Sequence, residues 1–212
     1  PDYALSLNNI AMIHFSLGDY KKSLNFNLLA LKVYEKTLGK EHRSYARSLN
    51  NIAGNYSSLG DYNKSLELNL LALDVYEKTV GKKHPDYALS LNNIGVNYSD
   101  LGKFNKALEF NLSALDILKK TLGKEHPVYA LSLSSVAGDY SSIGYLTKSL
   151  EFNLKALNIF EKTLGTDHPS YSTSLSSIAL NYQRLGDFQK ALEINLLTLE
   201  IYESSLSKEH PS

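Results

Sequence analysis

Hydrophobic residues along the chain recur at the three- and four-residue spacing of amphipathic helices. From residue 45 to residue 59 the apolar positions are Leu49, Ile52, Ala53, Tyr56 and Leu59. This spacing places them on one face of a helix. Gly60 follows, and glycine is suited to the left-handed conformation that ends a helix. The pattern therefore predicts one helix that ends just before residue 60.

The residues that follow predict a second helix. Asp61 can cap it by accepting hydrogen bonds from the free amides of its first turn. Its main apolar stripe carries Leu66, Leu70, Leu73 and Val80. Gly81 ends it, and His84-Pro85 marks the start of the next first helix, because proline suits a first helical turn. Two helices of roughly 15–19 residues would each be about 22–28 Å long.

The helix pair recurs along the chain with a period of 42 residues. Residues 42–83 and 84–125 are identical at 26 of 42 positions. Histidine keeps the same step at His42, His84, His126, His168 and His210. The repeats are predicted at 1–42, 43–84, 85–126, 127–168 and 169–210, within a single domain spanning residues 1–212. Because neither helix buries its stripe alone, the predicted fold is an all-α solenoid of five helix–turn–helix repeats.

Residues at fixed positions of the repeat carry a family resemblance. The small and aromatic positions of the tetratricopeptide repeat are matched by Ile52, Ala53, Tyr56, Gly60, Tyr62 and Ala72. The 42-residue period and the linker Leu-Gly-Lys-x-His-Pro resemble the repeats of kinesin light chains in particular. The resemblance implies a right-handed superhelix with the first helices lining its concave face.

Composition argues against several classes of function. Lys and Arg total 22, as do Asp and Glu, so the formal net charge is zero and no basic run offers a surface for nucleic acid. The absence of Cys excludes disulfides, thiolate metal sites and a Cys nucleophile. No apolar stretch approaches the ~20 residues of a membrane span. We expect no nucleic-acid or membrane partner, and a cytoplasmic location.

The repeated histidines suggest a metal or catalytic site, but their spacing argues against one. Ligands of one zinc ion lie ~2.0–2.1 Å from it, whereas equivalent residues of stacked helices are about 8–10 Å apart. No glycine-rich phosphate loop is present. We predict instead that each histidine bonds free backbone groups at a helix start. We expect no catalytic residue, no metal site, no cofactor and no enzyme activity.

A ladder of asparagines replaces the usual aromatic residue of the second helix. It comprises Asn27, Asn69, Asn111, Asn153 and Asn195. Their spacing from the core leucines places them on the buried stripe, where an amide needs hydrogen-bond partners. We predict that each one bonds a backbone group of a neighbouring helix and fixes how the repeats dock.

A second set of asparagines lies on the first helices and supplies the candidate peptide-binding residues. They are Asn8, Asn9, Asn50, Asn51, Asn55, Asn92, Asn93 and Asn97. The resemblance implies that these positions face the groove, where light-chain relatives use similar asparagines to hold the backbone of an extended peptide. One amide can accept from a peptide N–H and donate to its C=O. A solvated polar face without a ligand is the alternative.

The predicted groove offers little charge for selecting side chains. Serine pairs at 134–135 and 176–177 replace the asparagine pair in the last two repeats. The arginines at groove positions, Arg47 and Arg184, are two or more repeats apart and form no carboxylate clamp. We therefore expect a peptide site that relies on backbone contacts.

Two classes of function remain open. The first is a scaffold that binds a peptide or protein partner, and the second is a spacer or self-associating module. The ends of a solenoid need polar capping repeats, yet the last helix, from Leu192 to Tyr202, is as apolar as the internal ones. Its open face favours self-association or further repeats. Since the chain starts at Pro1, we also expect it to be a segment of a longer protein.

Overall fold

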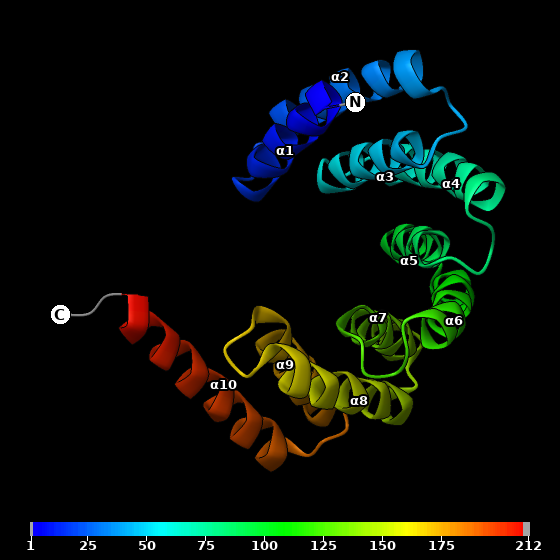
Figure 1. Cartoon of the computed structure of the whole chain (residues 1–212). Coiled ribbons are helices and arrows are strands. Elements are labelled where there is room, and N and C mark those ends of the chain that lie inside the picture. The colour runs from blue at the N-terminus through cyan, green and yellow to red at the C-terminus, as the bar shows by residue number, and fades with distance from the viewer. Residues whose placement is uncertain (1, 210–212) are drawn as a thin grey trace. The chain divides into compact units, whose positions relative to one another are not determined.

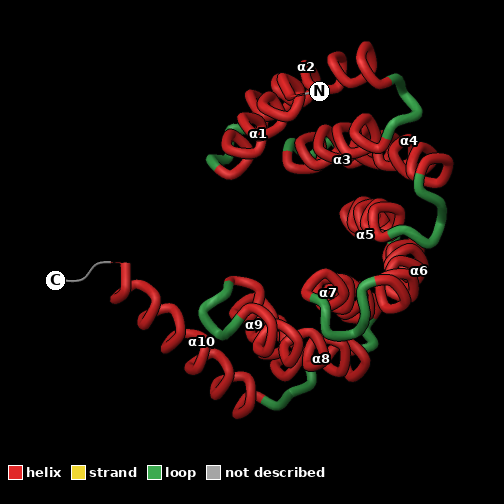
Figure 2. The backbone as a smooth tube through the Cα atoms, in the orientation of Figure 1, coloured by secondary structure: helices red, strands yellow, loops and turns green. Residues whose placement is uncertain are grey.

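Helices account for all the regular structure in the part of the chain that can be described. The computed structural model describes residues 2–209, with side chains through residue 203, and His210 of the histidine series lies outside them. This part forms ten α-helices and no strand (Figures 1 and 2). The helices are α1 (Asp2–Ser16), α2 (Tyr20–Leu38), α3 (Arg43–Ser58), α4 (Tyr62–Thr79), α5 (Pro85–Asp100), α6 (Phe104–Thr121), α7 (Pro127–Ile143), α8 (Leu146–Leu164), α9 (Pro169–Arg184) and α10 (Phe188–Glu209).

The helix boundaries lie where the sequence signals place them. Gly60 has a φ of 85° and follows α3, as predicted for a residue in the left-handed region. Asp61 caps α4, and its carboxylate accepts from the backbone N–H of Lys64 at 3.0 Å. Helices α1 to α9 have 15–19 residues, as predicted, whereas α10 is longer, with 22.

Histidine caps the start of four first helices. Nδ1 of His42 accepts a hydrogen bond from the backbone N–H of Ser44 at 3.1 Å, and His84, His126 and His168 repeat this contact two residues along at the same distance. Each capping histidine has an extended backbone conformation and directly precedes its helix. The prediction that these residues bond free backbone groups at helix starts is confirmed.

The chain divides into two compact units, Pro1–Ile117 (unit 1) and Leu118–Ser212 (unit 2). In unit 1, α2 packs against both α1 and α3, and α4 packs against both α3 and α5. In unit 2, α8 packs against α7 and α9, and α10 packs against α9. A second helix thus lies between the first helix of its own repeat and the first helix of the next. The predicted all-α helical repeat solenoid is confirmed.

Close packing of the helices depends on small residues at fixed positions. The second helices contribute alanines with no exposed surface, namely Ala30, Ala72, Ala114 and Ala156. First helices contribute branched residues that are 1% exposed or less, namely Ile52, Ile94, Val136 and Ile178. Burial of these side chains is the main favourable contribution to stacking. Because these buried residues fix one face of each first helix against its neighbours, they also fix where the asparagines on the other faces lie.

Candidate functional site

The first members of the first two asparagine pairs dock one first helix against the next. Asn8 is buried, and its Nδ2 lies 3.5 Å from Oγ of Ser48 on α3. Asn50 donates from Nδ2 to Oγ of Ser90 on α5 at 2.9 Å. Asn92, at the equivalent position of α5, is half-buried. These contacts hold α1, α3 and α5 in register.

The second member of each pair is exposed. Asn9, Asn51 and Asn93 lie on α1, α3 and α5, and their side-chain amides make no hydrogen bond with another described residue. Neighbouring residues in a helix project about 100° apart, because one turn takes 3.6 residues. The same turn that docks Asn8 therefore leaves Asn9 toward solvent. Of the eight candidate asparagines, these three are the exposed ones.

The two remaining candidates are buried between helices. Asn97 donates from Nδ2 to Oγ of Ser65 at 2.8 Å, and its Oδ1 accepts from Asn69 at 2.6 Å. Asn97 therefore ties α5 to α4 and presents no free amide atom. Asn55, also buried, donates from Nδ2 to the backbone carbonyl of Asn51 at 2.9 Å, within its own helix.

The asparagine ladder of the second helices is buried as predicted, except at its last member. Asn27, Asn69, Asn111 and Asn153 are at most 4% exposed. Asn195 on α10 is exposed, because no described first helix follows it. The partner of Asn69 is the side chain of Asn97, whereas the sequence led us to expect a backbone group.

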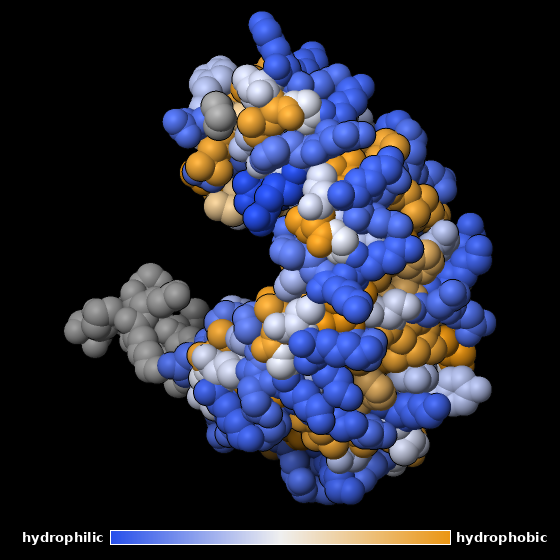
Figure 3. Space-filling view, turned by 45° about the vertical axis from the view of Figure 1, so that its right-hand side comes forward, coloured by the Kyte–Doolittle hydropathy of each residue, from blue (hydrophilic) through white to orange (hydrophobic). Residues whose placement is uncertain are grey.

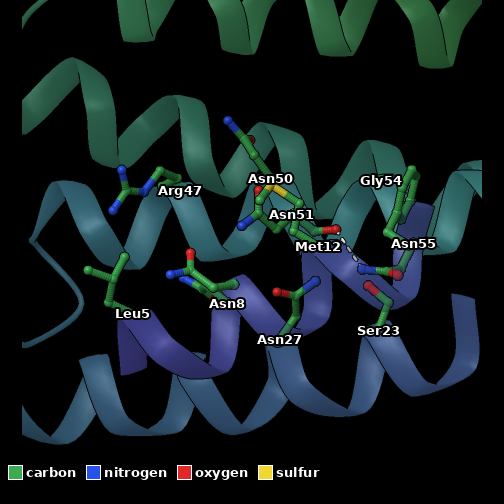
Figure 4. A pocket seen from close by; sticks show the side chains of 12 residues that line it. Leu5, Asn8, Met12, Ser23, Asn27, Arg47, Asn50, Asn51, Gly54 and Asn55 are labelled. Atoms are coloured by element: carbon green, nitrogen blue, oxygen red, sulfur yellow. Dashed lines mark hydrogen bonds between the residues drawn. The ribbon is translucent and has the colours of Figure 1, made fainter. Parts of the chain in front are cut away.

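A recess opens in unit 1 where α1, α2 and α3 meet (Figure 4). Its volume is about 430 Å³. It is lined by Leu5, Asn8, Asn9, Met12, Phe15, Ser23, Asn27, Arg47, Asn50, Asn51, Gly54 and Asn55. Five of the eight predicted peptide-binding residues therefore line one recess. Arg47 is the only charged residue among those that line it.

Several lining residues lay outside the sequence prediction. Ser23 and Asn27 come from the second helix α2 and reach the recess from below the first helices (Figure 4). Gly54 carried a usable signal, because glycine inside a helix costs roughly 0.5–1 kcal/mol relative to alanine. An added Cβ there would have no atom within 4 Å. The glycine therefore leaves the recess open toward the backbone of α3.

Unit 2 holds an equivalent recess between α7, α8 and α9. Its volume is about 300 Å³, and Ser149, Asn153 and Asn181 occupy the positions of Ser23, Asn27 and Asn55 one hundred and twenty-six residues earlier. Asn181 donates from Nδ2 to Oγ of Ser149 at 2.9 Å. The asparagine pairs are replaced by serines, whose hydroxyls bond carbonyls of their own helices.

The repeat geometry and the sequence agree with a single family. The tetratricopeptide repeat family matches residues 2–78, 50–120 and 129–204. The chain belongs to the tetratricopeptide repeat family. None of the curated protein sequences compared with this tetratricopeptide repeat chain matches it.

Solved structures similar to this tetratricopeptide repeat chain include kinesin light chain-like proteins. A Podosopora anserina protein described as a kinesin light chain with nearly identical TPR-like repeats is 26% identical, with a TM-score of 0.72, over 98% of this chain and 96% of that one. BtubC (BKLC) from P. vanneervenii is 21% identical, with a TM-score of 0.78, over 97% of this chain and 82% of that one. A Rap protein complexed with Competence and Sporulation Factor shares the fold at 18% identity and a TM-score of 0.81, and the match covers 95% of this chain and 54% of that one.

Other kinds of site find no support in the described residues of this tetratricopeptide repeat chain. No group of three or more His, Asp or Glu side chains there is arranged to hold a metal ion. No described helix is long and apolar enough to cross a membrane.

Hydrophilic side chains cover much of the face seen in Figure 3, with apolar side chains between them. Burial raises the pKa of Tyr76 to about 12, but this tyrosine lines neither recess.

Proposed function

We propose that the chain is a protein-interaction scaffold that holds an extended peptide against the first helices of unit 1. The observation that carries this proposal is the row of exposed amides at Asn9, Asn51 and Asn93. Each amide offers one acceptor and two donors, so it can pair with a peptide N–H and a peptide C=O. Repetition of the amide at one position of α1, α3 and α5 suits a ligand whose own backbone repeats.

The same lining favours a ligand that is recognised mainly through its backbone. Arg47 is the one charged residue in the unit 1 recess, so a strongly acidic or basic segment has little to pair with. Such a scaffold requires no cofactor, metal ion or catalytic residue, and we propose none. A cytoplasmic location stays a prediction, which cell fractionation with an antibody to the chain would check.

The proposal is tested by screening the chain against a library of short synthetic peptides. Binding is measured by fluorescence anisotropy for the natural sequence and for a triple variant, Asn9→Ala, Asn51→Ala and Asn93→Ala. A matched control changes three exposed asparagines of second helices, namely Asn25, Asn105 and Asn158, to Ala. Circular dichroism at 222 nm establishes that all three proteins keep the same helix content.

We expect the triple variant to lose affinity by about tenfold or more, since each net hydrogen bond contributes ~0.5–1.5 kcal/mol. The control should bind like the natural sequence. If no peptide binds, or if both variants bind equally well, the first-helix amides are not a recognition site.

A second candidate function, end-to-end association of copies, is favoured by the exposed surface of α1. Ile10 is 40% exposed, whereas Ile52 and Ile94 at the equivalent positions are at most 1% exposed. Tyr3 is 68% exposed, against 9% for Tyr87. These side chains lie where an internal repeat packs on the preceding second helix. Because the repeat is regular, α10 of a second copy has the matching stripe for this face of α1, including exposed Leu192.

Analytical ultracentrifugation over a hundredfold range of protein concentration tests end-to-end association. We expect the mean mass to rise with concentration and Ile10→Glu to abolish the rise. Leu154→Glu, which changes an exposed leucine of α8, should leave the rise unchanged. A constant monomer mass for the natural chain would exclude this candidate.

A further inference from the structure

Three apolar side chains of one helix border the unit 1 recess and remain exposed. They are Leu5, Met12 and Phe15 of α1, which are 46%, 64% and 39% exposed. Leu5 and Met12 are about two helical turns apart, so they lie on the same face of α1 (Figure 4). Covering an exposed apolar side chain with another apolar group is favourable, because both surfaces leave water. This wall of the recess therefore favours an apolar ligand group.

The polar residues at the bottom of the recess offer little surface to a ligand. Ser23, Asn27 and Asn55 are at most 3% exposed, and the oxygen atoms of their side chains are buried. A polar ligand group that left water here would lose hydrogen bonds that these residues do not replace. The exposed polar side chains of the lining are those of Asn9, Arg47 and Asn51.

Gly54 provides room for a side chain beside this wall. The equivalent residues are Met12 in α1 and Val96 in α5, and both are exposed. At Gly54 an added Cβ would have no atom within 4 Å, so no other side chain fills the space. The recess has a volume of about 430 Å³, whereas a cavity of about 150 Å³ is enough to hold benzene. A leucine-sized group therefore fits.

We propose that the recess of α1, α2 and α3 accepts one large apolar side chain, of about the size of leucine, from the bound peptide. Asn9 and Asn51 line this recess and are two of the three amides proposed to hold the peptide backbone. A backbone held by these amides passes the opening of the recess, and every second side chain of an extended peptide points to the same side. This inference rests on the proposed peptide scaffold and names one side chain that the scaffold selects.

The charges of the lining argue against a charged side chain. No carboxylate lines the recess to balance an ammonium or guanidinium group, and Arg47 repels both. A carboxylate would meet Arg47, but that side chain is exposed and an exposed ion pair contributes little. The unit 2 recess provides a contrast within the same chain. Among the described residues that line it, Leu180 is the one with an apolar side chain, so we expect no such preference there.

The test uses Met12 as a reporter, because it is the only methionine in the chain. Labelling with ¹³C-methyl methionine therefore gives one NMR signal, from the wall of the recess. The probe is acetyl-Gly-Ser-Ala-Leu-Ala-Ser-Gly with an N-methylamide end, beside versions with Gln, Glu or Lys in place of Leu. Kd is measured from the shift of the Met12 signal and from fluorescence anisotropy of the labelled peptides. Gly54→Val fills the recess with the residue that the next repeat carries, and Gly138→Val makes the same change in the unit 2 recess.

We expect the Leu peptide to bind about tenfold more tightly than the Gln, Glu and Lys peptides, because only leucine buries apolar surface without leaving a polar group unbonded. It should also move the Met12 signal furthest. Gly54→Val should weaken binding of the Leu peptide to the level of the Gln peptide, and Gly138→Val should leave the preference intact. Circular dichroism at 222 nm establishes that both variants keep the helix content of the natural chain.

Equal affinity for all four peptides, or a preference for leucine that survives in Gly54→Val, overturns the apolar site. If Asn9→Ala, Asn51→Ala and Asn93→Ala together still abolish binding in that case, the scaffold proposal stands. A Met12 signal that moves with the concentration of the chain alone shows that a second copy covers the recess, and this result also overturns the apolar site. If none of the peptides binds at millimolar concentration, both proposals are overturned.

Discussion

Gly95 and Gly54 both lie inside a helix, but only Gly95 has a neighbouring side chain where a Cβ would be. A Cβ added at Gly95 of α5 would clash with the amide of Asn111 on α6, at 2.6 Å from Cγ and 2.8 Å from Nδ2. Asn111 is 1% exposed, so its side chain has little room to move away. At Gly54 and Gly138, by contrast, an added Cβ has no atom within 4 Å. Gly95→Ala and Gly54→Ala are therefore the same chemical change with and without a clash.

The size of the clash follows from the difference between the two variants. Alanine favours a helix interior over glycine by roughly 0.5–1 kcal/mol, and both variants gain this amount. Overpacking a closed core typically costs about 1–3 kcal/mol, and only Gly95→Ala incurs it. We expect Gly54→Ala to be more stable than the natural chain. We expect Gly95→Ala to be less stable than Gly54→Ala by about 1–3 kcal/mol.

Urea unfolding followed by circular dichroism at 222 nm measures both variants with one probe. In thermal unfolding the same gap corresponds to roughly 2–4 °C per kcal/mol for a chain of this size. The double variant Gly95→Ala/Asn111→Ala completes a cycle that isolates the contact, and its coupling energy should equal the clash. If Gly95→Ala is as stable as Gly54→Ala, or if the coupling is zero, Asn111 does not hold position 95 as glycine.

Three further predictions concern single side chains. The free energy of unfolding should fall as pH rises from 10 to 12, because the pKa of Tyr76 is raised to about 12 in the folded chain. In urea unfolding, Tyr76→Phe should lose about 1 kcal/mol less of this free energy between pH 9 and pH 11 than the natural chain loses. His126→Ala should lower stability by about 0.5–2 kcal/mol, because Val128 loses its capping acceptor, and His126→Asn should restore most of it in thermal unfolding. Asn97→Ala should cost about 1–3 kcal/mol of unfolding free energy and Asn55→Ala clearly less, because the Asn55 amide bonds only its own helix.

Helix boundaries were predictable because each depends on a local signal. Gly60 must take a left-handed φ and Asp61 must cap, whatever the neighbouring repeats do. The burial of Asn27 was also predictable, because its spacing from core leucines fixes its face of α2. Asn195 shows the limit of that argument. The same position on α10 is exposed, because burial requires a following first helix as well as the correct face.

The sequence predicted only part of how the asparagine pairs are arranged. Adjacent residues project about 100° apart in a helix, so Asn8 and Asn9 point in different directions although both border the unit 1 recess. That geometry alone predicts that the two members of a pair have different surroundings. Which member docks depends on where the next first helix lies, and Ser48 and Ser90 reveal this only once α1, α3 and α5 are stacked.

The unit 1 recess depends on a choice that the local sequence does not make. Asn55 and Asn97 have the same register, and each has an asparagine four residues earlier in its helix. Nevertheless Asn55 bonds a carbonyl of α3, while Asn97 bonds Ser65 of α4. The first junction has one of these hydrogen bonds and three unbonded side-chain oxygens, whereas the second junction has two hydrogen bonds and one unbonded oxygen. The serine and the two asparagines are the same at both junctions, so the difference arises from the residues packed around them and not from the three residues themselves.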